Sequence, residues 1–271
     1  MDFAELRFWS ASQDRWARMA AFIPPGRGPH PVVLLLHGLG GDSGSWALDY
    51  DVHPLFAPLR SIVIMPDAGN GYYVDDPRPA GCGRTESLVL KDVLGCADRV
   101  FHTRKDPAHR SVAGISMGGY GALMLALRHP DTFGRAAALS PSLYFGHSPH
   151  PRGAARQDHL ASALPDGEYD CFQLAARHAP GVRRPDIWLS VGRSDAHLAT
   201  CRSFHDRLEA LRWPHVYREA KGGHDRAFWA RELPAMVEFL NTRPIETAGP
   251  TAERARSGSS GIPADTPGLD P

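Results

Sequence analysis

The feature that most constrains the fold of this chain is a series of short, unbroken apolar runs. The first, "HPVVLLLHG" at 30–38, places consecutive apolar residues between turn-forming ones, which is typical of a strand buried on both faces. Later segments repeat this composition, namely "SIVIMPD", "SVAGIS", "RAAALSPS" and "DIWLSVG", with "HVYREA" as a weaker sixth member. Helix-patterned stretches separate these runs. The alternation predicts an α/β fold with a mostly parallel central sheet and helices on both of its faces.

Helical patterns occupy the stretches between the runs. In "ESLVLKDVLGCADRVF" apolar residues recur at helical spacing, and "YGALMLALRHP" is apolar nearly all round, which predicts a buried helix. "LATCRSFHDRLEALRWP" and "FWARELPAMVEFL" are amphipathic, and Pro234 predicts a kink or a helix start within the latter. At the N-terminus, "ELRFWSAS" and "RWARMAAFIPP" predict an antiparallel strand pair near the edge of the sheet.

The length of the chain favours one domain. A chain of 271 residues, 42% of them hydrophobic, is enough for one sizeable α/β unit and marginal for two. We expect this domain to span residues 1–244, with an irregular, His-, Pro- and Gly-rich excursion at 141–185. Residues 245–271 cannot bury enough apolar surface to order themselves, so they predict a disordered C-terminal tail.

Charge and hydropathy exclude several classes of partner. Lys plus Arg (30) balance Asp plus Glu (30), so nothing indicates a nucleic acid or another polyanion. No apolar run approaches the roughly 20 residues that span a membrane, and the N-terminus has no signal-peptide core. We therefore expect a cytoplasmic protein without a membrane partner. The sequence leaves a homo-oligomer open.

No cofactor or metal is expected. The glycine-rich segments match no nucleotide-binding fingerprint, and "HSPH" at 147–150 lacks the companions of a structural zinc site, which favours a solvated loop. The four cysteines are widely spaced and predict free thiols; they are Cys82, Cys96, Cys171 and Cys201.

One serine lies in an unusual setting. In "VAGISMGGYGALMLA" Ser116 stands between Gly114 and Gly118, after a predicted buried strand and before a predicted buried helix. Gly-x-Ser-x-Gly in this context predicts a nucleophile elbow, a turn so sharp that the neighbours two positions away must lack side chains. The alternative is a tight glycine turn with a structural serine.

A serine nucleophile needs a base and an acid that orients the base. For an elbow of this kind the chain order is Ser, acid, His, each in a loop after a strand. Asp195 follows the strand "DIWLSVG", and His224 lies in the glycine-rich loop after "HVYREA". The other acids and histidines are worse placed: Asp186 starts its strand, Asp206 lies within a helix, Asp225 adjoins His224, His129 ends a helix and His215 opens a strand. Ser116, Asp195 and His224 are the candidate catalytic residues.

Acyl transfer also requires hydrogen-bond donors for the developing oxyanion. The backbone N–H of Met117, next to the serine, is one candidate. The loop "HGLGGDSGSW" supplies the other, and we favour the N–H of Leu39, with Gly38 and Gly40 as close alternatives. Its glycines let the backbone approach a substrate closely, so Gly38 and Gly40 are also candidate substrate-binding residues.

With these residues in place, the sequence resembles the α/β-hydrolase superfamily, and within it the esterase group that contains esterase D, tributyrin esterase and feruloyl esterases. The resemblance spans roughly residues 30 to 240 and rests on "LLLHGLGGDSGSW", "VIMPDAGNGYYVDDP", "VAGISMGGYGALMLALRHPDTFGRAAALSPSL" and "GGHDRAFWARELPAMVEFL". It implies that Ser116, Asp195 and His224 are nucleophile, acid and base, with main-chain oxyanion donors at Leu39 and Met117.

The resemblance also implies a substrate-binding border. Tyr72, Tyr73 and Asp75 fall where the group has residues that border the active site, although packing of the loop by its own aromatic rings is the alternative for them. Trp46 is expected in the core rather than as a substrate platform. The excursion at 141–185 is expected over the active-site face.

These observations predict a serine carboxylesterase that hydrolyses short-chain acyl esters as small-molecule substrates. The alternatives are a thioesterase like S-formylglutathione hydrolase, an acyltransferase that uses the same acyl-enzyme, and a catalytically silent binding protein on the same fold.

Overall fold

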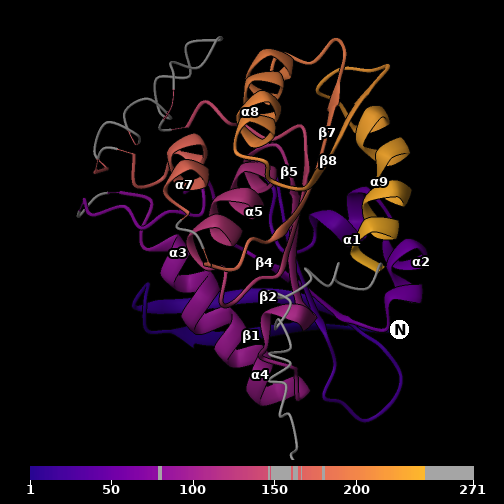
Figure 1. Ribbon diagram of the computed structural model, residues 1–271. Coiled ribbons are helices and arrows are strands. Elements are labelled where there is room, and N and C mark those ends of the chain that lie inside the picture. Colours follow the sequence, from indigo (N-terminus) through magenta and orange to yellow (C-terminus); the bar gives the residue numbers. More distant parts are fainter. Residues whose placement is uncertain are drawn as a thin grey trace, which may run out of the picture.

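The computed structural model describes residues 1–78, 81–145, 147, 160, 164–165, 167–178 and 181–241. Its centre is a mixed sheet in the order β1-β2-β4-β3-β5-β6-β7-β8 (Figure 1). The strands are β1 (Asp2–Ser10), β2 (Arg15–Ile23), β3 (Val32–Leu36), β4 (Ile62–Pro66), β5 (Arg110–Ile115), β6 (Arg135–Leu139), β7 (Asp186–Gly192) and β8 (His215–Ala220). All the apolar runs of the sequence became strands.

The sheet is parallel except at its N-terminal end. β1 pairs antiparallel with β2, and β2 pairs antiparallel with β4, whereas the pairs from β4 through β8 are parallel. The chain passes from β4 over β3 to β5, so the strand order reverses around β3. In open α/β sheets, ligands bind at the carboxyl ends of the strands beside such a reversal. The loops after β3 and β5 meet at that place.

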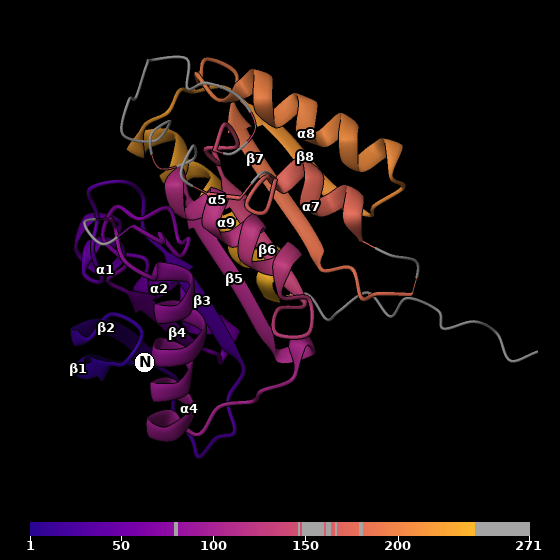
Figure 2. The ribbon, with the colours of Figure 1, turned by 90° about the vertical axis from the view of Figure 1, so that its left-hand side faces the viewer.

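Helices cover both faces of the sheet, as Figure 2 shows. The elements that follow β3 and the C-terminal helix pack on one face; they are α1 (Ser45–Asp49), α2 (His53–Phe56), η1 (Ala57–Leu59) and α9 (Arg226–Asn241). The other face carries α3 (Thr85–Ser87), the π-helical turn η2 (Leu88–Val93), α4 (Leu94–Phe101), α5 (Met117–Arg128), α7 (Cys171–Arg177) and α8 (Leu198–Ala210). A short 3-10 turn, η3 (Pro107–His109), precedes β5.

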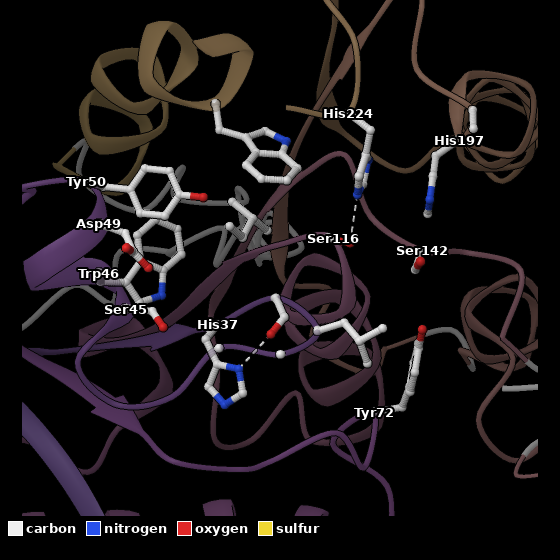
Figure 3. A pocket seen from close by; sticks show the side chains of 17 residues that line it. His37, Ser45, Trp46, Asp49, Tyr50, Tyr72, Ser116, Ser142, His197 and His224 are labelled. Atoms are coloured by element: carbon white, nitrogen blue, oxygen red, sulfur yellow. Dashed lines mark hydrogen bonds between the residues drawn. The ribbon is translucent and has the colours of Figure 1, made fainter. Parts of the chain in front are cut away.

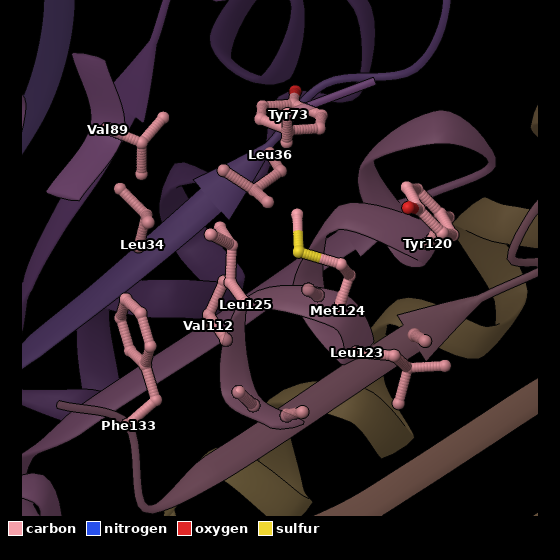
Figure 4. Close-up of a cluster of buried hydrophobic side chains, with 14 of the residues drawn as sticks. Leu34, Leu36, Tyr73, Val89, Val112, Tyr120, Leu123, Met124, Leu125 and Phe133 are labelled. Atoms are coloured by element: carbon pink, nitrogen blue, oxygen red, sulfur yellow. The ribbon is translucent and has the colours of Figure 1, made fainter. Parts of the chain in front are cut away.

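α5 is the helix that the sequence predicted to be buried, and every residue from Met117 to Leu127 is buried. Figure 4 shows the reason: Leu123, Met124 and Leu125 lie among apolar side chains of the neighbouring strands and of η2. A helix in this position is held firmly, so its first turn presents Ser116 from a rigid support.

Three details differ from the simplest sequence interpretation. The stretch 85–101 is helical throughout but widens into a π-helix at Leu88–Val93. α9 continues through Pro234 rather than starting there. A helix that the sequence did not predict, α7, lies within the 141–185 excursion and packs against α5 and α8.

Parts of the predicted excursion and the whole of the predicted tail cannot be compared with the structure. Residues 146, 148–159, 161–163, 166 and 179–180 of the excursion, and the whole of the predicted tail at 245–271, lie outside the described residues. Most of the "HSPH" segment lies outside them too. All four cysteines are free, as predicted. Among the described residues, none of the helices combines the length and the apolar character needed to cross a membrane.

Candidate active site

Ser116 occupies a strained elbow between β5 and α5. Its backbone has φ 54° and ψ −114°, a combination rarely adopted by residues other than glycine. A Cβ at Gly114 would lie 2.4 Å from the carbonyl oxygen of Gly118, and one at Gly118 would lie 2.3 Å from that of Leu36. A residue with a side chain therefore does not fit at either position, which is the physical basis of the Gly-x-Ser-x-Gly pattern.

The three candidate catalytic side chains form one hydrogen-bonded chain. His224 Nε2 lies 2.9 Å from Ser116 Oγ, and His224 Nδ1 lies 3.0 Å and 3.2 Å from the two carboxylate oxygens of Asp195. A carboxylate accepts hydrogen bonds, so Nδ1 carries the proton and Nε2 offers its lone pair to the serine hydroxyl. This is the tautomer that a general base for Ser116 must have.

Asp195 is held as a buried anion in the loop after β7. Its side chain is fully buried, and one carboxylate oxygen also accepts from the backbone N–H of His197 at 2.8 Å. Burial alone would raise the pKa of Asp195, but the hydrogen bonds from His224 and His197 outweigh it, and the pKa lies below its ordinary value. Asp195 is thus suited to orient and stabilise a charged imidazole.

Two rings that sequence reasoning missed enclose the His224 imidazole. His197 stacks on it with ring centroids 4.4 Å apart and planes at 10°, and Trp229 meets it edge-on at 5.0 Å and 88°. Figure 3 shows His197 beside His224, close to Ser116. Neither ring belongs to a motif of its own, although each lies within five residues of a predicted catalytic residue. Together they limit how far the His224 ring can turn.

Two backbone N–H groups of the loop after β3 already donate hydrogen bonds within the protein. The N–H of Gly40 donates to Asn70 Oδ1 at 2.8 Å, and that of Gly41 donates to the Gly38 carbonyl at 3.1 Å. Gly40 is therefore a poor alternative as an oxyanion donor. The N–H groups of Leu39 and Met117 have no acceptor among the hydrogen bonds between described residues, and Met117 is the first residue of α5. These two amides therefore stay the candidate oxyanion donors.

His37, which the sequence analysis left without a role, anchors this loop. Its Nδ1 donates to the Gly38 carbonyl at 2.8 Å, and its Nε2 accepts from the N–H of Ala68 at 3.2 Å. The ring is therefore neutral. Burial lowers the pKa of His37, and the hydrogen bond to Gly38 offsets this only in part. His37 serves to fix the loop backbone rather than to transfer protons.

A cavity of about 570 Å³ opens beside Ser116. Its walls come from the loop after β3, from α1 and from the loops that carry the candidate triad (Figure 3). The lining residues are His37, Gly38, Leu39, Gly40, Gly41, Ser45, Trp46, Asp49, Tyr50, Tyr72, Ile115, Ser116, Ser142, Ala196, His197, His224 and Trp229. Trp46 is buried, as expected, and also forms part of the wall.

Of the three predicted border residues, Tyr72 lines the cavity but Tyr73 and Asp75 do not. Tyr73 is fully buried, and its hydroxyl donates to the His37 carbonyl at 2.9 Å. Its ring also packs so closely on α5 that a Cβ at Gly121 would lie 2.4 Å from it. Asp75 accepts from the N–H and hydroxyl of Ser87 at 2.8 and 2.6 Å. Both residues support the loop from behind, so the packing alternative describes them better.

Two groups of side chains could hold a metal ion in the part of the chain that the structure describes. One is Asp195, His197 and His224, which the hydrogen bonds above already engage. The other, His205, Glu209 and His215, lies outside the cavity.

Comparisons with known proteins identify the family of this chain. Residues 10–240 match the model of the family described as "Putative esterase". The acetyl esterase of Caldicellulosiruptor saccharolyticus is 24% identical over 225 residues, which are 78% of this chain and 83% of that protein. The iron(III) enterobactin esterase of Escherichia coli (strain K12) is 32% identical over 207 residues, 73% of this chain but only 46% of that protein.

The fold is also that of solved hydrolase structures. The fluorophosphonate-binding serine hydrolase FphF of Staphylococcus aureus superimposes with a TM-score of 0.79 and 21% identity, over 89% of this chain and 98% of that one. At this identity the likeness concerns the fold. Because the family model spans residues 10–240, from the last residue of β1 to the last turn of α9, this protein belongs to the Putative esterase family, on an α/β-hydrolase fold.

Proposed function

We propose that this protein is a serine carboxylesterase that hydrolyses short-chain acyl esters through an acyl-enzyme on Ser116. The observation that carries the proposal is the chain from Ser116 Oγ through His224 to Asp195, at 2.9 and 3.0 Å, beside a cavity of small-molecule size. Membership of an esterase family supports the reaction class.

In the first half-reaction, His224 Nε2 takes the hydroxyl proton as Ser116 Oγ attacks the ester carbonyl. The carbonyl oxygen becomes an oxyanion, and the N–H groups of Leu39 and Met117 donate to it. The tetrahedral intermediate collapses as His224 gives its proton to the leaving alcohol. The acyl group remains on Ser116.

In the second half-reaction, His224 takes a proton from water, which attacks the acyl carbonyl. The acid leaves and the proton returns to Ser116. Asp195 stabilises the charged imidazole in both steps, which its low pKa permits because the carboxylate stays ionised at neutral pH. The strained elbow holds the half-buried Ser116 on the cavity wall at the start of α5 in both steps.

The walls of the cavity support a small ester as substrate. Aromatic rings of Trp46, Tyr50, Tyr72 and Trp229 line it, and a volume of about 570 Å³ accommodates a short acyl chain together with a small alcohol. The name of the similar acetyl esterase from Caldicellulosiruptor saccharolyticus supports the short acyl group.

The test is hydrolysis of p-nitrophenyl esters from acetate to decanoate by wild type and by Ser116→Ala. We expect activity highest on the short chains, and a fall in kcat of at least about 10⁴-fold in the variant, because the nucleophile is lost. Ser203→Ala, which removes an exposed hydroxyl on α8, is the matched control and should keep wild-type turnover. A Ser116→Ala enzyme with most of the wild-type activity would refute the assignment.

Two additional measurements test the alternative functions, which are a catalytically silent binding protein, a thioesterase and an acyltransferase. A fluorophosphonate probe should label wild type and Ser203→Ala but not Ser116→Ala. Acyl thioesters and added alcohols in the same assay distinguish an esterase from a thioesterase or an acyltransferase. A thioester preference of more than about tenfold in kcat/KM, or products that depend on the concentration of added alcohol, would replace the carboxylesterase by one of those activities.

A further inference from the structure

A second cluster of ligating side chains lies where α8 ends and β8 begins. His205 and Glu209 stand one turn apart on α8, and His215 is the first residue of β8. His205 Nδ1 lies 2.7 Å from His215 Nε2, and Glu209 Oε1 lies 3.9 Å from the same His215 nitrogen. One ligand atom from each of the three residues lies within 4.8 Å of the others. Figure 2 shows α8 running alongside β8, which brings these positions together.

The tautomer of His215 is determined by its surroundings. Its Nδ1 lies 2.7 Å from the carbonyl oxygen of Trp213, and a carbonyl can only accept, so Nδ1 carries the proton. In the neutral ring Nε2 then carries the lone pair, and it lies 2.7 Å from His205 Nδ1 and 3.9 Å from Glu209 Oε1. Histidines that bind metals commonly donate their other ring N–H to a backbone carbonyl in this way. The His215 side chain is only 1% exposed, so its orientation is held by the protein.

The second histidine is also oriented. The His205 ring stacks on Tyr217 with centroids 4.3 Å apart and planes at 11°. Glu209, by contrast, is 66% exposed and can swing toward an ion without disturbing the core. One fixed imidazole, one oriented imidazole on a helix surface and one adjustable carboxylate resemble the protein ligands of three-ligand zinc sites, in which water takes the fourth position.

We propose that His205, Glu209 and His215 form a binding site for Zn²⁺ that joins the end of α8 to the start of β8. In a tetrahedral site with Zn–N bonds of about 2.0–2.1 Å, two ligating nitrogens lie about 3.3 Å apart. The imidazoles must therefore separate slightly from their present 2.7 Å. The half-buried His205 on the helix surface supplies this movement. Its Nδ1 proton moves to Nε2 by exchange with water, so that the ring stays neutral and both ligating nitrogens offer lone pairs to the ion.

The position of the site predicts its role. α8 begins immediately after the Asp195 loop, and β8 leads directly into the loop of His224. The proposed ion would join the opposite ends of these two elements, because His215 starts its strand and His205 and Glu209 lie in the last turns of the helix. A bound ion would thus stabilise the unit that carries the candidate acid and base, and it would leave the chemistry at Ser116 unchanged.

The test uses the full chain, free of any affinity tag and treated with a chelator. Zn²⁺ is added while thermal unfolding and bound metal per chain are measured. We expect one ion per chain and a rise in Tm of roughly 5–10 °C at a hundredfold excess over Kd. Glu209→Gln and His205→Phe should abolish most of this rise, and the phenylalanine keeps the stacking on Tyr217. Asp206→Asn, a neighbouring exposed carboxylate on the same helix, should keep the full rise.

Hydrolysis of p-nitrophenyl acetate at 25 °C shows whether Zn²⁺ binds instead at the candidate catalytic residues. Zn²⁺ at the proposed site should leave turnover within about twofold. The proposal is overturned if no ion binds at micromolar Zn²⁺, or if the rise in Tm survives in both Glu209→Gln and His205→Phe. In the second case, inhibition by Zn²⁺ would place the ion on Asp195, His197 and His224 instead. The binding and Tm measurements do not depend on the proposed esterase activity.

Discussion

At the scale of single residues, the candidate site depends on positions where a larger side chain does not fit. Ser116 adopts φ 54°, and this conformation persists only because the chain around it is closely packed. Gly114 is one of these tight positions, with the carbonyl oxygens of Gly118 and Leu36 at 2.4 and 2.8 Å from where a Cβ would lie. Both atoms are backbone atoms of buried elements, so neither can move aside easily.

We therefore expect Gly114→Ala to lower the free energy of unfolding by about 3 kcal/mol or more, because the added methyl group forces β3, β5 and α5 apart. Urea denaturation measures the change. Gly95→Ala is the control: its Cβ would meet only Arg99, at 3.5 Å, and alanine is the better helix former, so this variant should be neutral or slightly stabilising. Equal effects of the two substitutions would contradict the steric argument.

A further prediction at this scale concerns Asp195. In Asp195→Asn the side chain can no longer hold the Nδ1–H tautomer of His224 or stabilise its charge. We expect kcat on p-nitrophenyl acetate to fall by about 10⁴-fold with the fold intact.

The matched control for that variant is Asp225→Asn. Asp225 caps α9 by accepting from the N–H of Phe228 at 2.9 Å, and asparagine remains a good cap. It should retain most of the activity, although Asp225 is the nearer acid in sequence. A larger loss in Asp225→Asn than in Asp195→Asn would reverse the assignment of the acid.

At the scale of secondary-structure elements, a buried carboxylate fastens the helical stretch 85–101 to the end of α5. Glu86 accepts from Arg128 at 2.8 Å, from His129 at 2.7 Å and from the Tyr169 hydroxyl at 2.9 Å. Burial would raise the pKa of Glu86, but these donors outweigh it and the pKa lies below its ordinary value of 4.5. Three segments distant in sequence thus meet at one side chain.

Glu86→Gln should lower the free energy of unfolding by about 2 kcal/mol at pH 7, because it removes the buried counter-ion of the largely buried Arg128 and leaves only the more exposed Glu168. A carboxylate with a depressed pKa stabilises the fold above the pKa of the unfolded chain and ceases to do so as the pH falls through its folded pKa. The difference between wild type and variant should therefore shrink below about pH 4.5.

Glu168→Gln is the control for that prediction. Its carboxylate bonds the same Arg128 at 3.0 Å but is 39% exposed, so we expect a change of no more than about 0.5 kcal/mol. Urea titrations of the three proteins between pH 3.5 and 7 measure both effects. A gap between wild type and Glu86→Gln that widens on acidification would show that the carboxylate is not the stabilising group.

The elements themselves were unevenly predictable. The strands and α5 followed from apolar runs, because a segment buried on both faces must be apolar throughout. α7 could not be predicted in this way, because it is a seven-residue helix in a polar, proline-rich region. Asp170, whose side chain accepts from the N–H of Phe172, is an N-cap that could have indicated it.

At the scale of the whole molecule, the sheet is what assembles the site. Ser116 and His224 are 108 positions apart in the chain, and His224 and Asp195 are 29 apart. They meet because β5, β7 and β8 are parallel, so that the loops after them emerge at one edge. The reversal of strand order at β3 adds the candidate oxyanion loop at the same edge. This common edge explains why chain order, together with a position in a loop after a strand, was enough to select the three candidate side chains.

The amino-acid sequence by itself determined the order and type of the main elements, the elbow at Ser116 and the identity of the three candidate catalytic residues. Such features depend on local pattern, on the steric needs of glycine and on the rule that parallel strands share one edge. Only the tertiary structure decided that Gly40 is tied to Asn70, that Tyr73 and Asp75 brace the loop from behind, and that His197 and Trp229 enclose His224. Those contacts join loops whose conformations follow from packing across the whole domain, and no local pattern encodes them.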